Sequence, residues 1–132
     1  MTLYTTKEHI CYATLEAVAY QVREALDALE LDSGIKLNTL KVDGGMTSNA
    51  LLMQIQADAL HVPVAVPQET ETTALGAAFA AGLAIGVWES IDVLKSVNPV
   101  ARTYTPTNKD ATDTDIKLNR WKEIVQRTLN LE

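Results

Sequence analysis

In two segments of the chain, a short run that contains β-branched residues leads into a helical pattern. This repeated order of strand and helix limits the possible folds more than any other feature. The first runs from residues 39–42 through Asp43-Gly44-Gly45 into a helical pattern that ends near Leu60. The second runs from residues 62–67, which contain two prolines, into an Ala/Gly-rich helical pattern. An amphipathic helix over residues 7–30 precedes both. This alternation predicts a parallel α/β sheet with right-handed crossovers.

The first helix carries apolar residues at steps of three or four, and Gly34 follows it as a residue that tolerates a left-handed backbone. The only cysteine, Cys11, lies on this apolar stripe, so we expect it to pack in the core. One cysteine cannot form an internal disulfide, and the chain has no Asn-x-Ser/Thr sequon. Both features favour a reducing compartment and predict a cytoplasmic protein.

Composition narrows the class of protein. The chain has 132 residues, 47% of them hydrophobic and 21% charged, which is enough for the core of one domain. Its net charge of −6 repels phosphate backbones and anionic lipids, so we expect no nucleic-acid partner and no basic membrane surface.

One stretch has to be weighed as a membrane span. Residues 72–88 contain no charged side chain, yet they reach only the lower limit of about 17 residues for a span. Glu69 and Glu71 precede the stretch as the first turn of a soluble helix would require. We therefore predict a tightly packed core helix there and no membrane span.

The last part of the chain is less regular. Residues 97–112, with Pro99 and Pro106, read as an extended connection to the C-terminal helix. A helix over residues 113–128 places its apolar side chains largely on one side, so we expect it to dock on the body of the domain.

The most informative local motif is Gly44-Gly45 between a strand and a helix. Paired glycines let a ligand approach the backbone without interference from Cβ atoms, and the following helix, with Thr47 or Ser48 as its expected N-cap, offers N–H groups to an anion. This is chemistry suited to a phosphate group, although a lone glycine pair more often serves only as a turn. The GxGxxG and GxxxxGK[ST] fingerprints are both absent from the chain.

Other clusters of polar residues do not form a recognisable site. Asp110, Asp113 and Asp115 fail the calcium-loop template because no glycine follows the third acidic position. His9 and His61 have no His or Cys partner at ligand spacing. We assign no catalytic residue and no metal ligand in this chain.

Two motifs together resemble a known superfamily. Residues 42–49 look like the adenosine motif of the sugar-kinase and actin ATPase superfamily, and residues 71–78 resemble the alanine-rich element that follows it. Within the superfamily the similarity is greatest to the C-terminal part of the FGGY carbohydrate kinases, in particular those that act on glycerol. It extends to residues 13–16, residues 52–58 and Trp121-Lys122.

The resemblance implies an ATP-dependent kinase that phosphorylates a terminal hydroxyl of glycerol, with Mg²⁺ neutralising the phosphates of ATP. It further implies that Gly45 approaches a phosphate through its backbone and that Asn49 hydrogen-bonds near the adenine–ribose end. Gly44 and Met46 would shape the same wall of the ATP site. The helix over residues 73–82 would allow close packing near the domain interface, without direct chemistry.

The implied fold is α/β: a ribonuclease H-like (actin-like ATPase) domain that lacks its first antiparallel strands, with parallel strands flanked by helices. Residues 1–132 would then be a single partial domain. The family's catalytic aspartate, glycerol-binding residues and phosphate-binding hairpins lie upstream of the matching region. ATP or ADP and glycerol would therefore bind to the full-length enzyme, and Mg²⁺ would be held mainly by residues outside this chain. We expect the chain alone to be inactive, and its free sheet edge favours homo-oligomers.

Two alternatives remain open. Another FGGY kinase, such as a pentulose kinase, would share the nucleotide motifs, although Asp43 and Trp121-Lys122 favour the glycerol enzymes. A non-catalytic binding or oligomerisation module on the same scaffold is the second alternative.

Overall fold

The computed structural model describes residues 1–107 and 112–129. A long helix, α1 (Lys7–Ser33), leads into the short strand β1 (Leu40–Lys41), as the sequence predicts. Gly34 ends α1 with a left-handed φ of 68°. The remaining elements follow in alternating order: a 3₁₀ turn η1 (Gly45–Ser48), α2 (Ala50–Leu60), β2 (Val64–Pro67), α3 (Thr72–Ala84), α4 (Ile91–Leu94), β3 (Val100–Tyr104) and α5 (Thr112–Thr128).

The three strands form a small mixed sheet in the order β1-β2-β3. β1 and β2 pair in parallel, with Leu40 opposite Val64, which confirms the predicted crossover through α2. β3, in the stretch expected to be extended, pairs antiparallel with the other edge of β2. The ladder becomes irregular between Val66 and Pro67, where proline has no N–H to donate.

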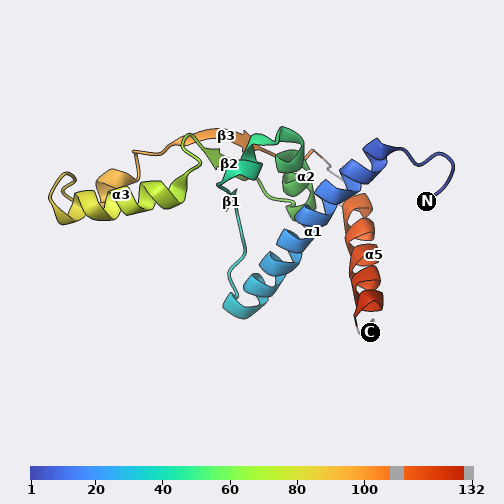
Figure 1. Cartoon of the computed structure of the whole chain (residues 1–132). Coiled ribbons are helices and arrows are strands. Elements are labelled where there is room, and N and C mark those ends of the chain that lie inside the picture. Colours follow the sequence, from blue (N-terminus) through green and yellow to red (C-terminus); the bar gives the residue numbers. More distant parts are fainter. Residues whose placement is uncertain (108–111, 130–132) are drawn as a thin grey trace.

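The core lies on one face of this sheet, where α2 packs between the strands and α1 (Figure 1). Val64 of β2 is 0% exposed and Leu52 of α2 is 2% exposed. Side chains from α1 and the sheet complete this cluster: Leu15, Val18, Leu26, Leu40, Val42 and Tyr104. Burial of these apolar side chains is the main force that holds the strands against α1 and α2.

The C-terminal helix α5 docks on the body, as its apolar side predicts. Leu118 is buried against Ala19, Tyr20 and the α2 side chains Ile55 and Ala59. The Trp121 ring lies 5.9 Å from that of Tyr20, and its Nε1–H donates to Glu24 Oε2 at 2.9 Å. These contacts tie the C-terminal end of the chain to α1.

Cys11 is exposed, so its predicted place in the core is wrong. The side chains of α1 that enter the core begin at Leu15. All residues of α1 before Leu15 are exposed.

The prediction of a tightly packed core helix over residues 72–88 is also wrong. α3 projects from the body together with α4 (Figure 1), and Gly82 is its only buried residue. Gly82 is covered by the ring of Trp88, which packs edge-on against Phe79 at 5.3 Å between ring centres. All other residues of α3 are exposed or partly exposed. None of the described helices is long and apolar enough to cross a membrane.

Candidate functional site

The candidate site lies where the parallel strands β1 and β2 end, because their carboxyl ends meet at one edge of the sheet. After β1 the chain enters the turn Gly44-Gly45, and after β2 it enters the loop of residues 68–71. Gly44 has a φ of 83°, a conformation that side chains rarely allow, so glycine is required there. The Gly44 N–H donates to the Thr70 carbonyl at 2.9 Å, which joins the turn to the loop.

Hydroxyl groups hold the turn from inside. The buried Thr47 donates its Oγ1–H to the Gly44 carbonyl at 2.7 Å, and Ser48 donates to the Gly45 carbonyl at 2.8 Å. Neither residue caps α2, so the predicted N-cap is wrong. The cap is Asn49, whose Oδ1 accepts the Leu52 N–H at 3.1 Å, because residues 45–48 form a 3₁₀ turn and the α-helix starts only at Ala50.

Gly45 and Met46 form the outer surface of the turn. A Cβ on Gly45 would meet no atom within 4 Å, and the φ of this residue is not positive. Neither packing nor backbone strain within the described residues therefore requires glycine at this position. The Gly45 and Met46 N–H groups find no acceptor among residues 1–107 and 112–129, as expected for the first positions of a helical turn. The Met46 side chain is 56% exposed.

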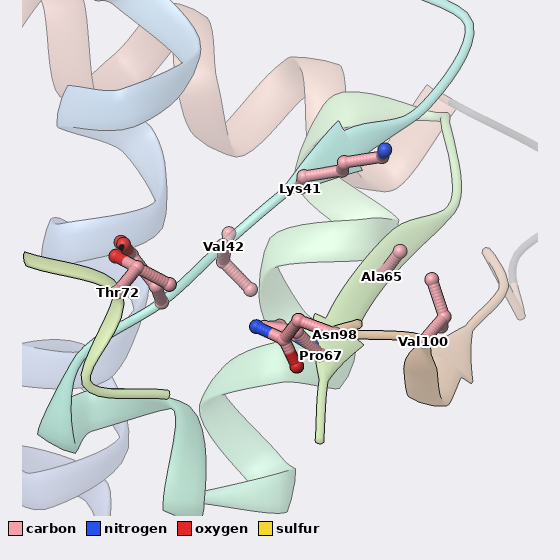
Figure 2. A pocket seen from close by; sticks show the side chains of 8 residues that line it. Lys41, Val42, Ala65, Pro67, Thr72, Asn98 and Val100 are labelled. Carbon is pink, nitrogen blue, oxygen red and sulfur yellow. Dashed lines mark hydrogen bonds between the residues drawn. The ribbon is translucent and has the colours of Figure 1, made fainter. Parts of the chain in front are cut away.

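A hollow of about 280 Å³ lies beside the turn, on the sheet face that α2 does not cover (Figure 2). Asp43 and Thr72 meet at its rim, where the Thr72 hydroxyl donates to Asp43 Oδ2. This contact joins the end of β1 to the first turn of α3. The hollow is lined by Lys41, Val42, Asp43, Ala65, Pro67, Thr72, Asn98 and Val100.

The structure places the four predicted site residues in one continuous turn: Gly44, Gly45, Met46 and Asn49. Their proposed contacts with a nucleotide stay predictions. Sequence reasoning missed Thr72 and Asn98 as neighbours of this turn. No local spacing could have found them, because Thr72 is 29 positions from Asp43 and the contact depends on the fold.

Two titratable groups with shifted pKa values, Tyr20 and Lys117, lie away from this turn, between α1 and α5. Burial and the nearby Glu16 carboxylate raise the pKa of Tyr20. Burial lowers the pKa of Lys117, but the carboxylates of Glu16 and Asp113 outweigh that effect and raise it. His61 Nε2 lies 3.0 Å from Asp115 Oδ1 and also joins α5 to the body. Within the described residues no group of three or more His, Cys, Asp or Glu side chains could hold a metal ion.

Comparison with known proteins identifies relatives of this arrangement. Glycerol kinase of Chloroflexus aurantiacus is 52% identical over 130 residues, which are 98% of this chain and 26% of that relative. Glycerol kinase 2 of Streptomyces avermitilis is 50% identical over 97% of this chain and 25% of its own length. The chain thus spans about a quarter of the length of the curated relatives it matches.

Solved structures agree with the sequence comparison. Plasmodium falciparum glycerol kinase, crystallised with ADP, is 36% identical and superposes with a TM-score of 0.85 over 100% of this chain and 26% of its own. Xylulose kinase of Rhodospirillum rubrum is 28% identical, with a TM-score of 0.76 over 98% of this chain and 26% of its own. Residues 1–85 match the model of the C-terminal domain of the FGGY family of carbohydrate kinases. The chain therefore belongs to the FGGY family of carbohydrate kinases and carries the actin-like ATPase fold of its C-terminal domain.

Proposed function

We propose that this chain supplies the nucleotide-binding wall of an ATP-dependent glycerol kinase. The observation that carries the proposal is the exposed backbone at Gly45. The N–H groups of Gly45 and Met46 have no acceptor among the described residues, and a Cβ on Gly45 would meet no atom within 4 Å. A phosphate group fits such an exposed backbone, because N–H donors can reach it without side-chain interference. The crystal structure of a similar glycerol kinase with ADP supports a nucleotide as the ligand.

In the complete enzyme, the γ-phosphoryl group of ATP would pass to a terminal hydroxyl of glycerol. Mg²⁺ would neutralise the phosphate charge, and its protein ligands would lie mainly in the part of the enzyme outside this chain. The chain's own residues would hold and orient the nucleotide: the Gly45 backbone at a phosphate, Asn49 near adenine or ribose, and Gly44 with Met46 as the adjoining wall. The chain alone would therefore transfer no phosphate.

The choice of glycerol rests on similarity. Identity is 52% to a glycerol kinase but 28% to a xylulose kinase over almost the same part of this chain. A pentulose kinase is the competing assignment, and an assay of the full-length parent protein with glycerol and xylulose separates the two.

A binding experiment tests the nucleotide site directly. ADP titrated into the ¹⁵N-labelled chain should shift the Gly44 and Gly45 amide signals, with weak affinity because only one wall of the site is present. Gly45→Ala should weaken the binding about tenfold, an effect of about 1.4 kcal/mol, since its methyl group would block the approach of the phosphate. Gly76→Ala is the matched control, because a Cβ there also meets no atom within 4 Å but lies on α3.

Three results would contradict the proposal. Equal ADP affinity for Gly45→Ala and the unmodified chain would remove Gly45 from the site. A chain whose signals do not respond to ADP at all would favour a non-catalytic module. Formation of glycerol 3-phosphate by the chain with ATP, Mg²⁺ and glycerol would show that it contains catalytic groups of its own.

A further inference from the structure

Asn98, just before β3, holds the loop between β2 and α3 through two hydrogen bonds to one residue. Its Oδ1 accepts the Glu69 N–H at 2.8 Å, and its Nδ2 donates to the Glu69 carbonyl at 2.9 Å. A side-chain amide can accept and donate at once, as a backbone peptide group does. Asn98 thus binds Glu69 as a neighbouring strand residue would.

Proline explains why a side chain takes this place. The Gln68 N–H donates to the Pro99 carbonyl at 2.9 Å, which continues the pairing of β2 and β3 beyond the regular ladder. Pro99 has no N–H to donate in return, so the backbone cannot extend the ladder further. The Asn98 amide supplies the next pair of hydrogen bonds in its place.

The other side of the same loop holds the glycine turn. The Thr70 carbonyl, one residue after Glu69, accepts the Gly44 N–H at 2.9 Å, and the Thr72 hydroxyl donates to Asp43. The loop is therefore fixed by Asn98 on one side and fixes Gly44 on the other. Asn98 and Thr72 line the same hollow (Figure 2), and Asp43 is also part of its lining.

From this chain of contacts we infer that Asn98 is a positioning residue for the Gly44-Gly45 turn. Within the described residues, the side-chain hydrogen bonds of Asn98 go to Glu69 and not to the turn. Asn98 fixes Glu69, and the adjacent Thr70 carbonyl fixes Gly44. The position of the Gly45 N–H group therefore depends on Asn98. The consequence for nucleotide affinity rests on the proposed function, whereas the consequence for the turn does not.

Amide hydrogen exchange of the complete 132-residue chain, measured by NMR without ligand, tests the inference. In Asn98→Ala the Glu69 amide loses its acceptor, and we expect the Gly44 amide to exchange about threefold to tenfold faster as well, as the loss of a hydrogen bond of ordinary net strength predicts. Asn98→Asp keeps the acceptor for Glu69 N–H but not the donor, so it should give an intermediate rate. It also carries the test if Asn98→Ala fails to fold.

Ser96→Ala is the matched control. Its hydroxyl donates to the Val93 carbonyl at 2.9 Å, so the variant loses a hydrogen bond in the same segment without touching the loop. Gly44 exchange should stay at the original rate in this variant. An Asn98→Ala variant with faster Glu69 exchange but unchanged Gly44 exchange would overturn the inference, as would equal acceleration of Gly44 in Ser96→Ala.

ADP titration of the same proteins then separates the two proposals. If the original chain binds ADP, Asn98→Ala should bind about threefold to tenfold more weakly and Ser96→Ala equally well. Unchanged affinity in Asn98→Ala would contradict the positioning role. A lack of ADP response in the original chain would contradict the proposed function alone, because the exchange rates at Gly44 decide the role of Asn98 without nucleotide.

Discussion

Asn49 has two roles to separate, because the same side chain caps α2 and is proposed to contact the nucleotide. Its Oδ1 accepts the Leu52 N–H, and Leu52 is among the most buried residues of the core. Loss of an N-cap of this kind costs about 1 kcal/mol of stability. For a chain of this length the expected fall in Tm for Asn49→Ala is about 4 °C. Weaker ADP binding by this variant alone would therefore not identify a nucleotide contact.

Asn49→Asp separates the roles. Aspartate keeps the oxygen that accepts the Leu52 N–H, and its negative charge at a helix N-terminus is favourable. The fold should therefore be as stable as the original in thermal unfolding followed by circular dichroism. The variant lacks the amide donors of asparagine and adds negative charge near the proposed nucleotide, so ADP affinity should fall about threefold to tenfold.

Thermal unfolding and ADP titration should each single out a different variant. Asn49→Ala should show the lower Tm, and Asn49→Asp should show weak ADP binding at full stability. If Asn49→Asp binds ADP as tightly as the original chain, the side-chain amide makes no donor contact with the nucleotide. If Asn49→Ala has an unchanged Tm, the capping argument is wrong.

Two further predictions concern the packing of the helices. The free energy of unfolding should fall as pH rises above about 10, because Tyr20, with its raised pKa, keeps its proton in the folded chain while the unfolded chain loses it. Lys117 also has a raised pKa in the folded chain, so the stability that its positive charge contributes is lost over the same rise in pH. Urea unfolding at pH 9 to 11.5 measures this loss, and an equally steep decline in Tyr20→Phe would contradict the assignment to Tyr20. Gly82→Ala should destabilise α3 by about 1–3 kcal/mol, because a Cβ there would overlap the Trp88 ring, whereas Gly76→Ala should stabilise the helix by about 0.5–1 kcal/mol. The Trp88 indole signal in NMR spectra should move only in Gly82→Ala, and identical spectra for both variants would refute the packing argument.

The exposure of α3 is a property that the local sequence pattern could not predict. An uncharged run rich in Ala and Gly predicts a helix correctly, but it does not say which surface the helix packs against. Ile85, which follows α3, is 79% exposed, and Gly82 is the one buried residue of the helix. The pattern of this segment therefore predicts the helix but not the exposure of its surface.

The predicted N-cap of α2 was wrong for a different reason. Thr47, Ser48 and Asn49 are all good capping residues, so propensity could not decide among them. The choice depends on the 3₁₀ turn, in which Thr47 and Ser48 instead donate to the carbonyls of Gly44 and Gly45. Similarly, the apolar stripe of α1 placed Cys11 in the core although α2 and α5 cover only later turns of that helix.

The sequence by itself determined the order of the elements up to α3, the glycine turn and, through the resemblance of two motifs, the family, because periodicity, turn residues and motifs are local properties of the chain. Only the tertiary structure decided the antiparallel β3, the open face of α3, and the contacts of Asp43 with Thr72 and of Asn98 with Glu69. These depend on residues about 30 positions apart that meet at one sheet edge. Hydrogen bonds between such residues form only once burial of the apolar cluster around α2 has brought the strands together.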